Sequence, residues 1–271
     1  MNNLKLDWIR RMASGWLVAQ VLILAAPALP AEVNLPDSPV RVFRVRDLEP
    51  RDEDSVKLSA EVERVIEISN RLFRSNREGE PVYLFEREDR TDEGDRIHWL
   101  FVLEPEQLGL LRVEKKIISH SGKVVAESFY DFRDPMYNFP KNVAFLYTVV
   151  PVLQAMDLKV GAQHDLYLLL SLDQSPWHMF VVVDGRETVT VPAGTFPCYR
   201  IKLEPDYKNI MGKWSWASSL IKSLVPDYFF WVEEATPHYL IRFEGKFGPA
   251  GAVPTQAYEL ISVLPPPGGS L

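Results

Sequence analysis

The sequence is almost without cysteine: Cys198 is the only one among 271 residues. A single cysteine cannot form a disulfide within the chain, so the fold depends on its buried core. No cysteine lies directly after the apolar N-terminal segment, which argues against lipid attachment at that point. No acid–base partner neighbours Cys198 in the sequence, and we interpret it as a small, half-buried apolar residue.

The chain also lacks an excess of positive charge. Lysine and arginine number 30 against 37 aspartate and glutamate residues, which gives a formal net charge of -7. Binding to nucleic acid depends on a basic surface, so this balance predicts no nucleic-acid partner. With 46% hydrophobic and 25% charged residues, the composition excludes a disordered, collagen-like or polytopic membrane chain.

Recognisable catalytic motifs are missing as well. There is no phosphate-binding G-x-x-x-x-G-K-[ST] loop, no G-x-S-x-G nucleophile turn and no H-E-x-x-H zinc motif. The histidines are not spaced as metal ligands: His98, His120, His164, His178 and His238. Glu233 and Glu234 are adjacent, so in a strand they would point to opposite faces rather than act as a catalytic pair. We therefore expect a protein that is not an enzyme, with no cofactor and no metal.

The first 31 residues have the three-part pattern of a secretory signal peptide. Three basic residues lead into an apolar run over 15–26: Lys5, Arg10 and Arg11. Small residues end the segment, with candidate cleavage sites after Ala28 and after Ala31. The apolar run is shorter than the ~20 residues that a membrane span needs. The pattern predicts cleavage and export to the periplasm, with an uncleaved membrane anchor as the alternative.

Residues 32–80 form a leader for which the sequence favours no single structure. The first part, 32–55, is rich in proline and charged residues and is typical of an extended segment. Between Val56 and Val62 the apolar residues alternate as in a strand, but from Val62 to Phe73 they recur at helical spacing. We favour a helix after Val62.

From Pro81 to Leu264 the pattern is typical of a series of short β-strands. Apolar residues alternate or cluster over Pro81–Glu86, Ile97–Leu103, Leu110–His120, Val124–Phe132, Gln163–Leu172, Thr195–Glu204, Asp227–Glu233, His238–Gly245 and Gln256–Leu264. We expect one all-β domain over 81–264, a curved antiparallel sheet that closes into a barrel or half-barrel, with one or two accessory helices. Residues 265–271 are expected to form a flexible tail.

Four connections in this region carry turn signals. Ser121-Gly122-Lys123 predicts a tight turn, and Val191-Pro192-Ala193-Gly194-Thr195-Phe196 predicts a second one with glycine at a positive φ. The segment Pro176–Val191 is predicted as a hairpin with its turn at Asp184-Gly185. The charged run Arg87–Arg96 is interpreted as a solvated hairpin tip.

Two segments have helical spacing. Residues 142–156 carry apolar residues at helical intervals, and Pro151 is expected to end or kink that helix. Residues 208–225 place five apolar residues on one helical face: Ile210, Trp214, Ala217, Ile221 and Leu224. We weigh two roles for this second helix, a plug in the core of the barrel or a mobile lid over an apolar site.

The second half of the chain carries a set of distinctive motifs. They are the Leu146–Gly161 segment with its Leu-x-Val-Gly turn, Val183–Val189, the Val-Pro-Ala-Gly-Thr-Phe hairpin over 191–196, and Phe230–Glu233 followed by Pro237. In their order, over residues 142–263, these motifs resemble an exported bacterial family, the Domain-of-Unknown-Function-3108 family. The resemblance implies an exported, antiparallel, barrel-like β protein with no catalytic residues to carry over. It also implies turn and core roles for Gly194, Phe196 and Trp231.

Aromatic residues make up 11% of the chain. Most are expected in the core, because strands favour them, and some are expected to line a cavity, as in small ligand-binding barrels. The candidate ligand-binding residues are Tyr147, Trp177, Trp214, Trp216 and Trp231. Together with export, these features favour a periplasmic binding or carrier protein with an apolar, lipid-like ligand. The alternative is a non-catalytic structural or adaptor protein of the cell envelope, with a protein partner at its sheet edges.

Overall fold

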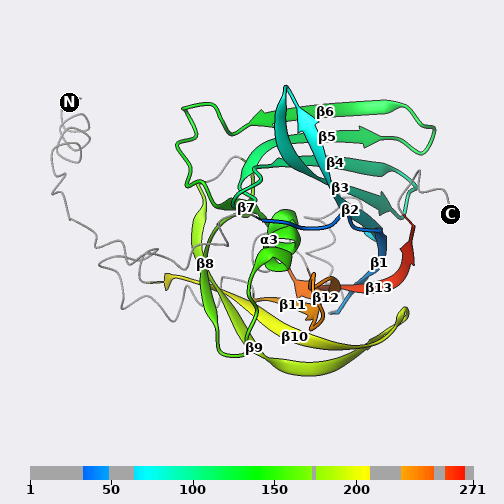
Figure 1. Cartoon of the computed structure of the whole chain (residues 1–271). Helices are drawn as coiled ribbons and strands as arrows, with labels where there is room; N and C mark the ends of the chain where they lie inside the picture. Colours follow the sequence, from blue (N-terminus) through cyan, green and yellow to red (C-terminus); the bar gives the residue numbers. More distant parts are fainter. Residues whose placement is uncertain (1–32, 49–63, 173–174, 208–226, 247–253, 266–271) are drawn as a thin grey trace, which may run out of the picture.

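The computed structural model describes residues 33–48, 64–172, 175–207, 227–246 and 254–265. In this part of the chain, thirteen strands form one sheet around a short helical segment (Figure 1). The strands are β1 (Val40–Asp47), β2 (Val65–Arg77), β3 (Glu80–Thr91), β4 (Arg96–Leu103), β5 (Leu110–Ile118), β6 (Val124–Asp131), β7 (Val143–Phe145), β8 (Gln163–Leu169), β9 (Trp177–Val191), β10 (Gly194–Pro205), β11 (Tyr228–Glu233), β12 (Leu240–Gly245) and β13 (Gln256–Leu264). The helical segment comprises the 3-10 turn η1 (Leu146–Thr148) and the helix α3 (Val149–Ala155).

Several predictions from the sequence lie outside the described residues. These are the signal peptide over 1–31, the helix over 208–225 with its two tryptophans, and residues 266–271 of the tail. Within the described ranges, no helix is long and apolar enough to cross a membrane.

The strand order is β6-β5-β4-β3-β2-β1-β13-β12-β11-β10-β9-β8-β7. Neighbouring strands are antiparallel throughout, apart from the parallel pair of β7 and β8. The sheet curls around α3 until β7 comes beside β5, while β6 and β7 remain its two edges in the described part of the chain (Figure 1). The predicted all-β class, with a curved antiparallel sheet that forms a barrel or half-barrel, is confirmed.

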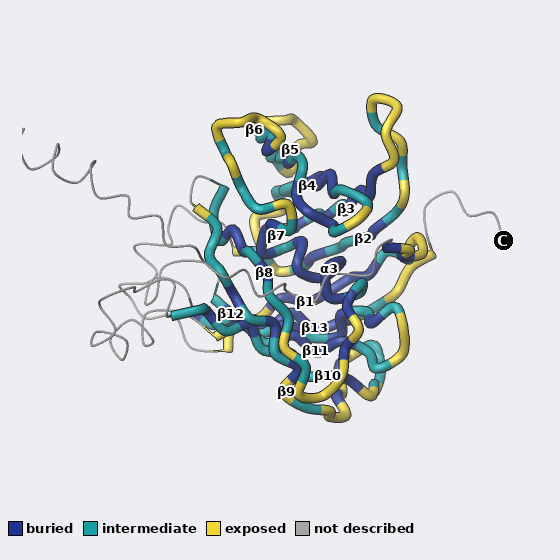
Figure 2. The backbone as a smooth tube through the Cα atoms, turned by 60° about the vertical axis from the view of Figure 1, so that its left-hand side comes forward, coloured by how far each residue is buried: buried dark blue, intermediate teal, exposed yellow. Residues whose placement is uncertain are grey.

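The hydrophobic core fills the space between the curved sheet and α3 (Figure 2). Side chains of a strand alternate between its two faces, so every second residue points inward. Ile201 and Leu203 of β10 are completely buried in this way, whereas Lys202 between them is not. The first five residues of α3, Val149–Leu153, are all buried. The helix is therefore part of the core rather than a surface element.

The seam where β7 comes beside β5 requires a glycine. Gly109, just before β5, approaches the backbone that leads into β7 so closely that a Cβ atom there would lie 1.8 Å from the carbonyl oxygen of Lys141. No side chain can be accommodated at that distance without movement of the backbone. Gly109 thus allows the sheet to curl back on itself.

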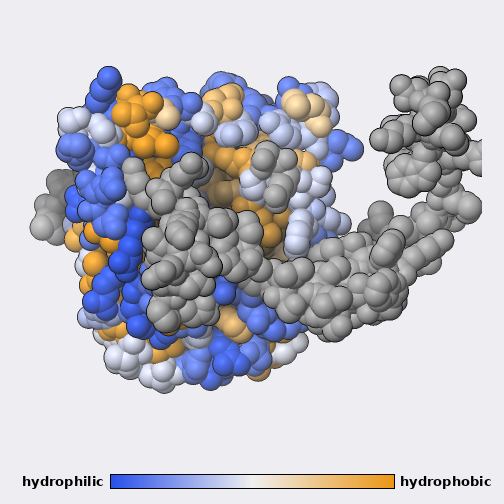
Figure 3. Space-filling model, turned by 180° about the vertical axis from the view of Figure 1, so that it is seen from behind, coloured by the Kyte–Doolittle hydropathy of each residue, from blue (hydrophilic) through white to orange (hydrophobic). Residues whose placement is uncertain are grey.

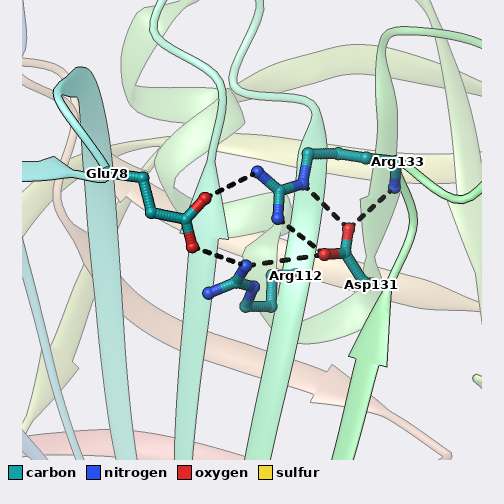
Figure 4. Close-up of polar contacts among 4 residues, drawn as sticks. All are labelled: Glu78, Arg112, Asp131 and Arg133. Carbon is teal, nitrogen blue, oxygen red and sulfur yellow. Dashed lines mark hydrogen bonds and ion pairs between the residues drawn. The ribbon is translucent and has the colours of Figure 1, made fainter.

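Four charged residues fasten β6 to the body of the sheet (Figure 4). Arg133, just after β6, donates to both carboxylate oxygens of Asp131 at 2.9 and 2.6 Å. Arg112 of β5 lies 3.5 Å from Asp131 and 3.1 Å from Glu78, which belongs to the turn between β2 and β3. The Arg133 guanidinium holds the pKa of Asp131 down at about 2.

The segment assigned to a leader contributes two strands. β1 and β2 pair with each other, and they join β13 to β3 at the centre of the strand order. The prediction of a helix after Val62 is wrong, because Val65–Arg77 is strand β2. The helical spacing rested on Val62, Val65, Ile66, Ser69, Leu72 and Phe73, but the residues that β2 buries are Ile68 and Leu72, which share one face of the strand.

The predicted hairpin turn at Asp184-Gly185 is also wrong. β9 runs without interruption from Trp177 to Val191 and pairs with β10 from Met179 to Val191. Asp184 and Gly185 lie at a shift of register, where Gly185 pairs with Arg200 and Val183 pairs with Ile201. Glycine is common both in turns and at β-bulges, because it adopts backbone conformations that other residues avoid. The Asp184-Gly185 pair therefore fitted a turn although it marks a bulge.

The predicted turns at Gly122 and Gly194 are confirmed. Gly122 has a φ of +86° between β5 and β6, and Gly194 has a φ of +144° between β9 and β10. Pro151 does not end a helix as expected: it lies in the first turn of α3, where proline is tolerated because its missing N–H has no intrahelical partner.

The outer surface is unevenly apolar. Seen from behind in Figure 3, hydrophobic residues gather around a hollow in the upper half of the molecule.

Candidate functional site

The interior of the sheet holds a buried ion pair on strand β3. Arg87 and Asp89 are 6% and 2% exposed, and the Arg87 Nε donates to the Asp89 Oδ1 at 2.6 Å. The indole Nε1 of Trp99 on β4 donates to the other carboxylate oxygen at 3.1 Å. The interpretation of Arg87–Arg96 as a solvated tip is therefore wrong for its first half, since β3 continues to Thr91 and only residues 92–95 form the turn.

Aromatic rings and a lysine surround this ion pair. The Arg87 guanidinium lies 3.7 Å from the centre of the Tyr147 ring and 5.5 Å from that of Tyr258. Burial by itself lowers the pKa of Arg87, but Asp89 and the two tyrosines raise it overall, so this arginine is charged. Burial raises the pKa of the Tyr147 hydroxyl to about 12. The cluster thus attaches η1 to β3 through a charged group inside the core.

A small cavity lies beside this cluster. Its volume is about 20 Å³, and its lining includes Asn70, Arg87, Tyr147 and Tyr258. A space of this size holds about one water molecule. This cavity is therefore too small for a lipid chain.

A much larger hollow of about 420 Å³ lies at one end of α3. We call it the mouth pocket, and it is lined by Val33, Asn34, Leu35, Pro36, Gln154, Ala155, Thr236 and Pro237. Three separate parts of the chain meet there: the segment before β1, the C-terminal end of α3, and the turn between β11 and β12. Pockets that bind small molecules typically have volumes of ~300–1,000 Å³, so the mouth pocket is of ligand size.

One wall of the mouth pocket is held in place by Tyr83 of β3. The backbone N–H of Leu35 donates to the Tyr83 hydroxyl at 3.0 Å, and that hydroxyl donates to the carbonyl oxygen of Val33 at 3.0 Å. Arg74 of β2 also donates to the same hydroxyl at 3.0 Å. Because Val33 and Leu35 are buried in the core, this wall is fixed to the sheet rather than free to swing.

A second buried arginine, Arg41, follows Pro36 of the mouth pocket by five residues in the sequence. Arg41 of β1 is 8% exposed, and its Nη2 is 3.7 Å from the Glu233 Oε2 of β11. Its guanidinium lies 3.8 Å from the centre of the ring of Tyr239, two residues after Pro237. Burial lowers the pKa of Arg41 and raises the pKa of Glu233.

Three of the five predicted ligand-binding residues lie in the described part of the chain, on three different elements. Tyr147 lies in the interior against Arg87, and Trp177 is half-buried at the start of β9. Trp231 lies on the opposite face of β11 from Phe230; its Nε1 donates to Glu187. Trp214 and Trp216 lie outside the described residues.

The buried charges were missed because charged residues were assigned to the solvent. A signal was nevertheless present: Tyr83, Phe85, Arg87 and Asp89 continue one period-two face of β3, and all four are buried. Alternation alone could have placed Arg87 and Asp89 inward. Arg41 had no such signal, because its strand was not predicted.

Cys198 is completely buried, more so than expected. Burial raises the pKa of its thiol to about 12, with the nearby carboxylate of Glu233 adding to the effect. The protonated thiol is a poor nucleophile at neutral pH. This agrees with its interpretation as a packing residue.

No family model matches this chain, so membership of the family suggested by its motifs stays a prediction. No curated protein matches it either. Among solved structures, a beta-barrel-like protein of the domain of unknown function DUF1849 from Brucella abortus is 11% identical, with 86% of this chain and 99% of that chain covered and a TM-score of 0.45. A candidate lipoprotein from Parabacteroides distasonis is 12% identical over 87% and 98% of the two chains, with a TM-score of 0.33. A candidate exported protein with a YmcC-like fold from Bacteroides fragilis is 11% identical over 87% and 99%, with a TM-score of 0.28.

Proposed function

We propose that this protein is an exported, non-catalytic binding or carrier protein that holds an apolar, lipid-like group in the mouth pocket. The observation that carries the proposal is the 420 Å³ hollow between residues 33–36, the end of α3 and the turn after β11. Its lining is largely apolar, with Val33, Leu35 and Pro36 on one side and Ala155 and Pro237 on the others.

In this proposal the ligand lies at the end of the sheet, in the mouth pocket. The interior cavity of about 20 Å³ admits about one water, whereas the mouth pocket has room for an alkyl group. Burial of each CH2 group stabilises a complex by ~0.8 kcal/mol. A chain of several methylenes in this pocket would thus be held without any movement of α3.

The proposal is tested by filling the pocket. Ala155→Trp places a large ring in the hollow, and we expect it to weaken binding of 1-decanol, a neutral apolar probe, at least tenfold in a calorimetric titration. Ala126→Trp makes the same change on β6, where the residue is exposed, and is expected to leave the affinity unchanged. Equal affinity in all three proteins, or no binding of 1-decanol to the parent, would contradict the proposal.

A second candidate function, a structural protein of the cell envelope, is favoured by the edge strand β6. Its first six residues are exposed on both faces, and Val124, Val125 and Phe129 are among the most exposed large apolar residues described, at 44%, 57% and 57%. An exposed edge strand presents unpaired backbone groups to another strand. Exposed apolar residues on such an edge favour strand pairing rather than prevent it.

A second copy of this chain fits this edge. If two β6 strands pair antiparallel with Glu127 at the centre, Val125 lies opposite Phe129 on one face and Val124 lies opposite Tyr130 on the other. The mass in solution would rise to that of a dimer with concentration. Val125→Lys combined with Phe129→Lys should keep the protein monomeric, unlike the control Val160→Lys, also at an exposed position. A parent protein that is monomeric at every concentration would exclude this function.

A further inference from the structure

Among the described residues, no charged side chain lines the mouth pocket, and its polar side chains are all neutral. Each of the three walls carries one of them: Asn34 in the segment before β1, Gln154 at the end of α3, and Thr236 in the turn between β11 and β12. Ligand pockets typically combine an apolar lining with a few polar groups that fix the orientation of the ligand. These three side chains are therefore the groups available to bind the polar end of a ligand.

The lining is graded from buried apolar residues to accessible polar ones. Val33 and Leu35 are 4% and 6% exposed, whereas Asn34 between them is exposed. Thr236 is exposed as well, and Gln154 is half-buried. The most buried part of the lining is thus apolar, and its polar side chains lie where solvent reaches them. This gradient orients an amphiphile with its alkyl chain inward and its head at the opening.

The polar side chains of the lining have hydrogen-bonding capacity to offer. The amides of Asn34 and Gln154 and the hydroxyl of Thr236 can each donate and accept. In the described part of the chain, the side chains of Gln154 and Thr236 form no hydrogen bond with another residue. The Asn34 Oδ1 accepts from Arg74, which leaves its amide N–H groups. A ligand hydroxyl can bind here without breaking a contact within the protein.

The charges around the pocket do not favour an anion. One acidic residue lies within two positions of each wall along the chain: Asp37, Asp157 and Glu234. No lysine or arginine lies as close in the sequence. The Arg74 guanidinium reaches Asn34, but it is exposed to solvent and does not belong to the lining. An anionic head in this pocket would lose hydration without gaining a counter-charge from the lining.

We propose that the mouth pocket selects amphiphiles with an uncharged, hydroxyl-bearing head, of the monoacylglycerol class, and that Gln154 and Thr236 bind this head. This inference rests on the proposed function and names its ligand class. The hydroxyls and the ester carbonyl of such a head match a lining that both donates and accepts. Carboxylates are rejected through desolvation, because the lining holds no cation to pair with them.

The test is a calorimetric titration of the full mature chain with four probes that share a ten-carbon chain: 1-decanoylglycerol, 1-decanol, decanoate and decyltrimethylammonium. We expect 1-decanoylglycerol to bind about tenfold more tightly than 1-decanol, through its additional hydrogen bonds. It should bind at least tenfold more tightly than either charged probe, because a charged head is costly to desolvate.

Variants of the lining test the two named side chains. Gln154→Leu combined with Thr236→Val keeps similar side-chain volumes but removes the hydrogen-bonding groups. The preference for 1-decanoylglycerol over 1-decanol should then fall from about tenfold to about twofold. Gln154→Lys places a cation on the lining and should raise the affinity for decanoate at least tenfold. Gln163→Leu, at an exposed position of β8, is the matched control and should alter no affinity.

The outcomes separate this inference from the function on which it rests. If none of the probes binds, both proposals fail. If the parent binds 1-decanol but binds decanoate as tightly as 1-decanoylglycerol, the pocket stands and the inference is overturned. Tightest binding of decyltrimethylammonium would assign selectivity to the acidic residues instead, and would also overturn it. These comparisons use the parent protein and hold whether or not a variant folds. An unchanged decanoate affinity in folded Gln154→Lys overturns the role of Gln154.

Discussion

The Arg87 Nε and the Asp89 Oδ1 lie 2.6 Å apart, two residues from each other on one strand and both sealed inside the sheet. Side chains at positions i and i+2 of a strand share a face, so the pair needs no other element to bring it together. Trp99 occupies the second oxygen of Asp89, and Tyr147 covers the guanidinium. The pair thus places two opposite charges inside the core. It also marks the point where the helical segment attaches to the sheet.

Loss of one partner of this pair should be far worse than loss of both. Asp89→Leu leaves the Arg87 charge buried without a carboxylate, and we expect it to lower the free energy of unfolding by about 3–5 kcal/mol. The double variant Arg87→Met/Asp89→Leu should recover most of that loss, because no charge remains to be desolvated. Urea unfolding of the three proteins measures both values. An equal loss in the single and double variants would show that the pair acts through packing alone.

The seam at Gly109 is expected to tolerate no side chain. Gly109→Ala places a Cβ atom 1.8 Å from the Lys141 carbonyl oxygen, and the backbone has to move. Overpacking of this kind costs about 1–3 kcal/mol or more. Gly185→Ala is the matched control, since a Cβ atom at Gly185 has no heavy atom within 4 Å. Thermal unfolding should show a large drop for the first variant only, and equal melting temperatures would refute the close approach.

Acid should weaken the fastening of β6 over a defined range of pH. The pKa of Asp131 is lowered from 3.8 to about 2, chiefly by its hydrogen bond from Arg133. A carboxylate with a lowered pKa in the folded state stabilises the protein above its unfolded pKa and loses that contribution as the pH falls through its folded pKa. The window is therefore pH 4 to pH 2.

Because Arg133 is nearly half exposed, solvent screens this pair, and we expect a contribution of about 1 kcal/mol. Asp131→Asn should be less stable than the parent by that amount at pH 7, and the difference should disappear by pH 2. Urea unfolding at several pH values measures it. A difference that stays constant down to pH 2 would assign the effect to something other than the charge of Asp131.

Export is predicted from the sequence, and the mass of the mature protein tests it. When the chain is expressed in a bacterium with its own N-terminus, cleavage after Ala28 leaves Leu29 first, and cleavage after Ala31 leaves Glu32 first. Either mass in the periplasmic fraction supports the signal peptide. Retention of Met1 on an exported protein would favour the membrane anchor instead.

Local signals in the sequence were reliable where local physics decides the structure. Gly122 and Gly194 occupy turns with positive φ, a conformation that glycine adopts without steric cost, and both turns were predicted. The alternation that predicted strands over β10 and β12 likewise reflects one buried and one less buried face of a sheet. The pairing of β1 has no such local signature, since β1 is held by β13 more than 200 residues away. β2, in contrast, forms a tight hairpin with β3 across Glu78 and Gly79, and this local signal was overlooked.

The sequence by itself determined the β class of the chain, two of its glycine turns and the period-two faces of strands such as β10 and β12, because each depends on residues close together in the chain. Only the tertiary structure decided which charges are buried and where distant segments enclose a hollow. Arg87 and Asp89 are inside because the curled sheet closes over them, and the mouth pocket exists because residues 33–36, the end of α3 and the turn after β11 meet in space. Burial and the shape of a pocket depend on how distant segments pack, so they cannot be predicted from a short stretch of the sequence.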